Sequence, residues 1–301
     1  MTIGLSLQPK LLRPGLRGVW GMRMKQWNPE YIALFDESPS DKTYEEFQEI
    51  APFGLVPQKA SGKNIAYDDL INGYSTKIVN ISYGLGYKIT REMIDDNLYK
   101  EAMSMPKNLA NSVIQTVENV GANVFNRAFS ASYVGADSKA LCATDHPLVG
   151  GGTLANRIAV NADLSPTSLE QAFIDIGLFT DARGNKIQVM PKKLIVSVYD
   201  RYTASEITKS QYSPGNANNA INPVVLESLL PEGYAVNHFF TDTDAWFIRT
   251  DQEGIIMQKR VWPAEFRDDN DSQSLDVMQG CYFRLAFGWY DYRSVYGSPG
   301  A

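Results

Sequence analysis

Two histidines and two cysteines are the side chains of this chain best suited to chemistry. His146 lies in Thr144-Asp145-His146-Pro147, where an aspartate beside a histidine could orient the imidazole for base catalysis. Neighbouring residues of a strand point to opposite faces, however, so Asp145 is badly placed to hold His146. A structural histidine before a proline turn is the stronger interpretation. A hydrolase or metal enzyme that uses His146 is a distant alternative.

A zinc site is the second chemical possibility. Cys142, His146, His238 and Cys281 provide the residue types of a Cys₂His₂ site, but structural zinc ligands usually occur in close pairs, and only the first two are close in sequence. The sequence also lacks the glycine-rich phosphate-binding, nucleophile-elbow and His-Glu-x-x-His motifs. We therefore expect no catalytic residue, no metal, no cofactor and no enzyme.

The composition is that of a soluble globular protein. The 301 residues are 44% hydrophobic and 21% charged, which is enough apolar material for one large core or two modest ones. The net charge of -6 argues against a dedicated nucleic-acid binder, whose affinity comes from lysine and arginine. Two cysteines make no disulfide framework. We find no signal peptide and no apolar run of the roughly 20 residues that span a bilayer, so we expect no membrane contact.

The stretch from Tyr44 to Lys88 has an unusual composition for a part of a folded domain. This stretch is polar, rich in glycine and strand-like, and it has too few apolar residues to close a core. Residues 53–57 and 63–67 are expected to form a hairpin around a turn. Lys59 and Lys63 lie at its tip, where they are either solubilising charges or contacts to an acidic or asparagine side chain of another subunit.

A period-two pattern follows the expected hairpin and predicts a half-buried strand. Its apolar face carries Val79, Ile81, Tyr83 and Leu85, opposite small and polar residues. Such a ribbon is marginal alone in water, so something must cover this face. We expect another chain to cover part of it.

A long helical stretch follows from Thr90 to Ala131. Thr90 is a plausible N-cap, and apolar residues recur at helical spacing through the stretch. Pro106 lacks a backbone donor, so the helix is expected to kink or restart there.

The N-terminal segment, Met1 to Asp41, is expected to be an irregular arm because glycines and prolines interrupt every period. It nevertheless carries Trp20 and Trp27, which a solvated tail would not. The arm packs either on its own domain or on a neighbouring subunit, and the sequence leaves both alternatives open.

A second, mixed region begins at Ser165. Ser165-Pro166 has the pattern of an N-cap and first helical residue, with Thr167 and Glu170 as a possible capping box. Later elements are expected as strands at 187–190, 194–198 (central), 234–239, 245–249 and 254–260, a helix at 199–209, a polar loop at 267–274 and a strand at 281–289.

The chain resembles the major capsid proteins of tailed phages, in particular the Mu-like major head subunit (gpT-like) group. The resemblance is carried by the order of several short motifs, each weak alone. They are Ala51-Pro52-Phe53-Gly54, Gly62-Lys63-Asn64-Ile65-Ala66-Tyr67-Asp68, Gly73-Tyr74, residues 83–92 with 95–99, Thr144-Asp145-His146-Pro147, Ser165-Pro166-Thr167-Ser168-Leu169 and Pro191-Lys192-Lys193-Leu194-Ile195-Val196.

This resemblance implies an α+β fold, the tailed-phage major capsid protein fold. Its parts would be an N-terminal arm, an extended loop, a peripheral domain with a long spine helix, an axial domain and a return strand to the peripheral domain. In this sequence they would span residues 1–43, 44–89, 90–162, 163–266 and 267–301, respectively.

The same resemblance implies a structural head protein that self-assembles into hexamers and pentamers of an icosahedral shell around double-stranded DNA. Its partners would be itself, a separate scaffolding protein, a portal, a decoration protein in some relatives, and DNA held by weak non-specific contact. Assembly would take place in the host cytoplasm, and the product would be part of the virion capsid. An encapsulin-type compartment, which has the same fold and holds protein cargo, is the alternative.

Overall fold

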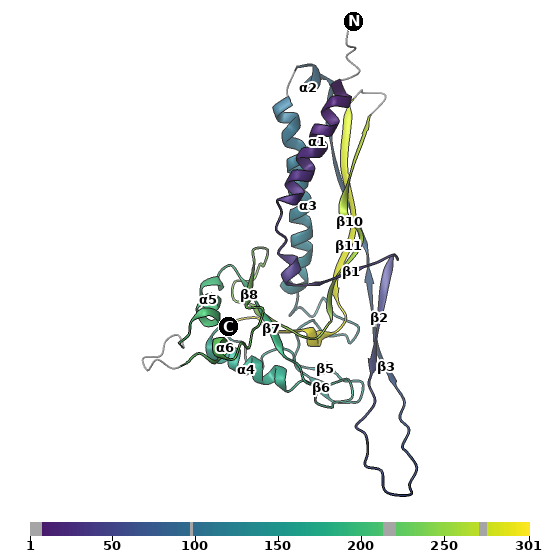
Figure 1. Ribbon diagram of the computed structural model, residues 1–301, viewed down its shortest axis with the longest axis vertical. Helices are drawn as coiled ribbons and strands as arrows, with labels where there is room; N and C mark the ends of the chain where they lie inside the picture. The colour runs from purple at the N-terminus through teal and green to yellow at the C-terminus, as the bar shows by residue number, and fades with distance from the viewer. Residues whose placement is uncertain (1–7, 97–98, 213–220, 271–275) are drawn as a thin grey trace.

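The structure is a computed structural model that describes residues 8–96, 99–212, 221–270 and 276–301. It is an α+β chain with a long unit of helices and sheet, a smaller unit beside one end of it, and a ribbon that projects past that same end (Figure 1). In the described part of the chain, no helix is both long and apolar enough to cross a membrane.

The long unit is built on a four-stranded sheet of order β1-β10-β11-β4. The strands are β1 (Asp36–Pro39), β10 (Ile255–Asn270), β11 (Val277–Trp289) and β4 (Ile81–Ile89). β11 runs antiparallel to both neighbours, with Met257 opposite Phe287 and Cys281 opposite Leu85. The alternating aromatic residues of 281–289 predicted β11, and the structure confirms this strand inside the sheet.

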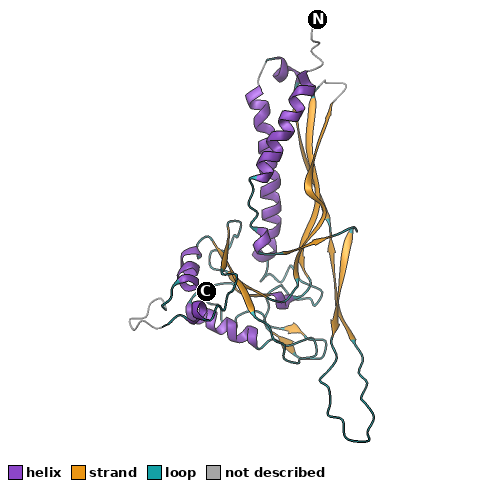
Figure 2. Ribbon diagram, viewed as in Figure 1, coloured by secondary structure: helices purple, strands orange, loops and turns teal. Residues whose placement is uncertain are grey.

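Helices α1 (Gln8–Lys25) and α3 (Tyr99–Asn126) lie together along one face of this sheet (Figure 2). The expectation of an irregular arm is wrong for α1, which continues through Pro14 and three glycines. Leu16 is fully buried, and Trp20 is buried against Phe266 with 5.3 Å between ring centroids. Burial of these large side chains outweighs the roughly 1 kcal/mol that each helical glycine costs.

The spine helix differs from the expectation at both ends. A short helix, α2 (Arg91–Asp95), comes first, and the Thr90 hydroxyl accepts the backbone N–H of Met93 at 3.4 Å. α3 then continues through Pro106 instead of restarting there, and it ends at Asn126. Buried residues on both sides of Pro106 hold the helix against the rest of the long unit.

The smaller unit has a second sheet of order β12-β9-β7-β8, in which the expected central strand β7 is indeed internal. Its strands are β7 (Pro191–Ser197), β8 (Tyr234–Asn237), β9 (Trp246–Thr250) and β12 (Val295–Ser298), and its helices are α4 (Pro166–Gly177), α5 (Arg201–Lys209) and α6 (Pro223–Leu226). Residues 187–190 form no strand.

The N-cap predicted at Ser165 is confirmed. Its side chain accepts the Ser168 backbone N–H at 3.1 Å, and the Ser168 hydroxyl accepts the Ser165 N–H in return. The capping box is therefore Ser165 with Ser168, and the expected pair of Thr167 and Glu170 is wrong. Ser168 is the residue three positions beyond the cap, which is where a reciprocal side chain can reach back.

The extended segment differs from the sequence-based hairpin in where its strands lie. β2 (Tyr44–Ala51) pairs antiparallel with β3 (Ile71–Val79), while residues 52–70, including 53–57 and 63–67, form a long loop without paired strands (Figure 2). Asn80 then separates β3 from β4. The single strand expected from the period-two pattern around Val79 to Leu85 is therefore divided between β3 in the ribbon and β4 in the long sheet.

The strand pairing crosses the expected part boundaries in two places. β10 was expected to end near residue 260, within the axial range 163–266, but it runs to Asn270 and pairs in the long sheet. The expected loop at 267–274 is therefore wrong for 267–270, and its residues 271–274 lie outside the described residues. The terminal strand β12 joins the small sheet, where Tyr296 lies opposite Ile248 of β9.

Candidate assembly surface and the polar cluster behind it

The loop at residues 52–70 exposes an unusual number of large apolar side chains. Val56 is 96% exposed and Tyr67 is 95% exposed. Soluble monomers scatter such residues singly over their surface, whereas a concentration of them marks a contact surface. We call this set of exposed residues the loop patch, and it consists of Phe53, Leu55, Val56, Ile65, Tyr67 and Leu70.

Lys59 and Lys63 lie in the same loop, in the turn where the Lys63 N–H donates to the Ala60 carbonyl at 3.1 Å. Both lysines are exposed. Their place at a turn agrees with the sequence-based expectation, although the flanking segments are not strands.

The expected apolar face of the ribbon is only partly covered by its own chain. Tyr83 stacks on Phe283 of β11 with 5.1 Å between ring centroids, so the chain itself covers this residue in part. Val79, Ile81 and Leu85 stay about half exposed, at 47%, 54% and 54%. Part of this apolar face is thus left exposed to solvent by its own chain.

A groove runs beside the exposed part of that face. It has a volume of about 650 Å³ and lies between β4, β11 and the C-terminal half of α3. Val79, Ile81 and Tyr83 line it, facing Val120 and Val124 of α3. The groove and the loop patch are two apolar surfaces that the described part of the chain leaves open.

Trp20 and Trp27, the two aromatic residues of the expected arm, are placed against their own chain. Trp20 is 6% exposed, and the indole N–H of Trp27 donates to the buried Glu118 carboxylate at 3.0 Å. Both tryptophans therefore pack on their own domain, which is the first of the two alternatives considered for the N-terminal arm.

Two arginines tie the projecting ribbon and loop to the rest of the chain. Arg183, in the turn after α4, pairs with Asp68 at 2.7 Å and donates to the Asp69 carbonyl. The backbone N–H of Gly54 also donates to Asp68 at 2.8 Å, and this N–H and the Arg183 guanidinium hold the pKa of Asp68 below its usual value. Asp68 thus joins both limbs of the loop to the smaller unit.

The second tie is buried. Arg293, which is 5% exposed in the turn before β12, pairs with Glu49 of β2 and with Asp291, at 3.2 Å each. Its Nε donates to the Thr180 carbonyl at 2.9 Å. The residues of this tie come from segments more than 100 positions apart.

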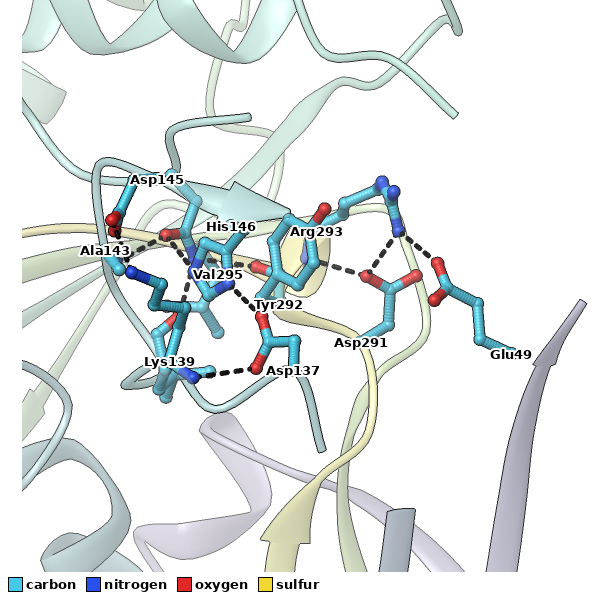
Figure 3. Close-up of polar contacts among 12 residues, drawn as sticks. Glu49, Asp137, Lys139, Ala143, Asp145, His146, Asp291, Tyr292, Arg293 and Val295 are labelled. Carbon is cyan, nitrogen blue, oxygen red and sulfur yellow. Dashed lines mark hydrogen bonds and ion pairs between the residues drawn. The ribbon is translucent and has the colours of Figure 1, made fainter. Parts of the chain in front are cut away.

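His146 lies next to this tie, at the centre of a buried polar cluster (Figure 3). The ring is fully buried, and it stacks on Tyr292 at 3.8 Å between centroids. Its Nδ1 is 2.5 Å from the Asp137 carboxylate, and its Nε2 is 3.0 Å from Oδ1 of Asn156. Asp145 instead pairs with Lys139, which agrees with the expectation that it does not hold His146.

The hydrogen bonds of Asn156 fix the orientation of its amide group toward this ring. The Asn156 amide N donates to the carbonyls of Leu141, Tyr292 and Val295 at 2.7, 2.9 and 2.9 Å, so its oxygen must face His146. Both ring nitrogens therefore lie against acceptor oxygens, one of Asp137 and one of Asn156. The arrangement is a buried hydrogen-bonded cluster that joins the segment 137–156 to the C-terminal segment at Tyr292 and Val295.

This burial leaves the histidine no catalytic role that a substrate could reach. Burial also raises the pKa of the Cys142 and Cys281 thiols, which disfavours the reactive thiolate. The described residues bring together no group of three histidine, cysteine or acidic side chains that could hold a metal. Cys142, His146, His238 and Cys281 thus do not form the zinc site considered from sequence.

Several residues of these surfaces carried no signal in the sequence. Asp137, Asn156, Arg183 and Arg293 look like ordinary surface residues, and only the fold shows their partners. The loop patch could have been found, because its large apolar residues interrupt an otherwise polar turn region.

Several solved structures have a similar fold. A virus-like particle from Pyrococcus furiosus matches with a TM-score of 0.56 at 8% identity, over 95% of this chain and 98% of the other. The procapsid of bacteriophage JBD30 matches with 0.52 at 12% identity, over 98% and 76%. Mycobacterium phage Patience matches with 0.51 at 10% identity, over 98% and 88%. At these identities the matches establish the fold alone.

The family comes from the sequence itself. No curated protein sequence matches the chain, but residues 74–298 match the family model described as phage capsid protein. This span is most of the chain, and it includes the spine helix, the small sheet and every strand of the long sheet except β1. The match favours a virion shell over an encapsulin-type compartment. The chain therefore belongs to the phage capsid protein family and is a structural major capsid protein.

Proposed function

We propose that the subunit assembles by laying the loop patch on an apolar surface of a neighbouring copy, with Val79, Ile81, Tyr83 and Leu85 covered in the same contact. The observation that carries this proposal is the exposure of the loop patch, which has no core of its own. Burying one large apolar side chain stabilises by about 1.5–3 kcal/mol, and association offsets part of that gain. Six such residues would together contribute on the order of 10 kcal/mol before that offset.

Lys59 and Lys63 lie beside the loop patch and belong to the same proposed contact, where a carboxylate or amide of the neighbour would meet them. The hexamers and pentamers, the enclosed double-stranded DNA and assembly in the host cytoplasm are supported by the family match. The separate scaffolding protein, the portal and a decoration protein have the same support. The Mu-like group is supported by the order of the short motifs between Ala51 and Val196.

The experiment compares two double variants of the loop. Val56→Asp with Tyr67→Asp puts two charges into the loop patch, while Gln58→Glu with Asn64→Asp adds the same charge to polar positions of the same exposed loop. Electron microscopy and sedimentation then report shells, capsomers and single subunits. We expect the wild type and the control to form shells, and the patch variant to stay as free subunits with a native circular dichroism spectrum. Shells from the patch variant in normal yield would refute the proposal.

A further inference from the structure

Helix α1 carries a charge opposite to that of the rest of the chain. Of the 28 basic residues, five lie in α1, and none of the 34 acidic residues does. The helix is therefore +5 in a chain of net charge -6, and the remaining residues sum to -11. A basic N-terminal segment on an acidic chain is a pattern typical of polyanion contact.

The described basic residues of α1 are also unmatched by carboxylates. Arg17 and Lys25 are exposed, and neither has an acidic partner within 4 Å among the residues that the structure describes. Arg23 donates to the amide oxygen of Asn111 at 2.6 Å, which leaves its charge uncompensated. Elsewhere, arginines and lysines of the sheets and ribbon form ion pairs, as Arg293 does with Glu49.

The neighbouring helix extends this unmatched positive surface. Lys100 and Lys107 of α3 are exposed and likewise have no acidic partner in the described part of the chain. The carboxylates facing this layer are few. Glu101 is exposed on α3, while Glu118 is buried and accepts N–H groups from the segment after α1. Glu265 of β10 lines the same groove as Arg17 but pairs with Arg267 at 2.8 Å.

The outer face of α1 lacks the features of a protein-binding surface. Between Arg17 and Lys25, the one large exposed apolar side chain is Met22, whereas protein interfaces depend on clustered aromatic and apolar anchors. At Gly18 and Gly21, a Cβ would meet no atom within 4 Å, so no described residue packs directly against the helix at these two positions. A low, basic face with no anchors suits a phosphate backbone better than an acidic peptide.

We propose that the outer face of α1, with Arg17 and Lys25 at its centre and Lys100 and Lys107 beside it, contacts the phosphate backbone of double-stranded DNA. Arg17 and Lys25 are eight residues apart, or about 12 Å along the helix, which spans several phosphates of one strand. The contact reads no base sequence. This inference rests on the proposal that the shell encloses DNA, and it assigns the helical layer to the inner face of the shell.

The test measures duplex binding by the unassembled full-length chain. A fluorescent 30-base-pair duplex is titrated by anisotropy between 50 and 200 mM NaCl, for the wild type and for Arg17→Gln with Lys25→Gln. The control, Lys186→Gln with Lys209→Gln, removes the same charge from exposed lysines of the smaller unit.

Each lost phosphate contact lowers the slope of log K against log salt by about 0.9, which amounts to about eightfold in affinity at 0.1 M. We expect the α1 variant to lose about 1.8 in slope and about 60-fold in affinity, and the control to bind like the wild type. Equal binding by the α1 variant and the wild type would overturn the inference. So would tighter binding of a 15-residue polyglutamate peptide than of the duplex, since that result would assign the face to an acidic protein segment.

Electron microscopy of the same preparations separates the two proposals. Shell formation by the wild type tests the proposed function, and duplex binding tests the role of α1. An α1 variant that forms normal shells and has lost duplex binding supports both.

Discussion

Replacement of the buried His146 is the most informative perturbation of this fold, because the chain contains a natural control. Its two histidines, His146 and His238, each face one carboxylate, Asp137 at 2.5 Å and Glu30 at 2.6 Å. The His146 side chain is 0% exposed and that of His238 is 57% exposed. Phenylalanine at either position keeps a flat ring and removes the ring nitrogen that contacts the carboxylate.

The expected magnitudes follow from burial. His146→Phe keeps the stack on Tyr292 but leaves the Asp137 carboxylate, 8% exposed, with the Lys139 backbone N–H as its remaining donor. Breaking a buried pair by removing one partner costs about 3–5 kcal/mol, a large part of the roughly 5–15 kcal/mol of a whole fold. His238→Phe breaks an exposed pair, which is worth less than about 1 kcal/mol.

Urea unfolding of the unassembled chain, followed by far-UV circular dichroism, gives both changes in the free energy of unfolding. We expect His146→Phe to lower the midpoint at an unchanged m-value. Adding Asp137→Asn should recover about 1–3 kcal/mol, because it removes the stranded charge. A loss for His146→Phe within about 1 kcal/mol of that for His238→Phe, or no recovery in the double variant, would refute the reasoning that the buried contact of His146 with Asp137 stabilises the fold.

Three further predictions concern the other polar contacts. Burial raises the pKa of Glu118, so above about pH 4.5 the native state binds more protons than the unfolded state. The contribution of Glu118 to stability is therefore complete below that pH, and it is lost as the pH rises through the raised pKa. The difference in unfolding free energy between the wild type and Glu118→Gln should therefore fall with rising pH, and a difference that rises with pH would contradict this sign. Arg293→Gln should increase hydrogen exchange in β2 and β3 by freeing Glu49, with no change in α4 as the internal control. Ser165→Ala should cost about 1 kcal/mol in thermal or urea unfolding by removing the α4 cap, whereas Thr167→Ala should cost much less.

The sequence by itself determined those features that depend on local pattern. Alternating aromatic residues predicted β11, and the Ser165-Pro166 pair predicted the start of α4. The polar stretch after Tyr44 has too few apolar residues for a core, which predicted a projecting segment. In each case the residues that decide the structure lie within a few positions of one another, so backbone geometry and period are sufficient.

Only the tertiary structure decided which of two local signals prevailed, and which distant residues meet. Glycines and prolines argued against a helix at 8–25 and against continuity at Pro106, but burial of Leu16, Trp20 and the α3 stripe outweighed both. The partners of His146 lie 9, 10 and 146 residues away, at Asp137, Asn156 and Tyr292, and no local period connects them. The free energy of such contacts depends on burial and distance in three dimensions, which the linear pattern does not contain.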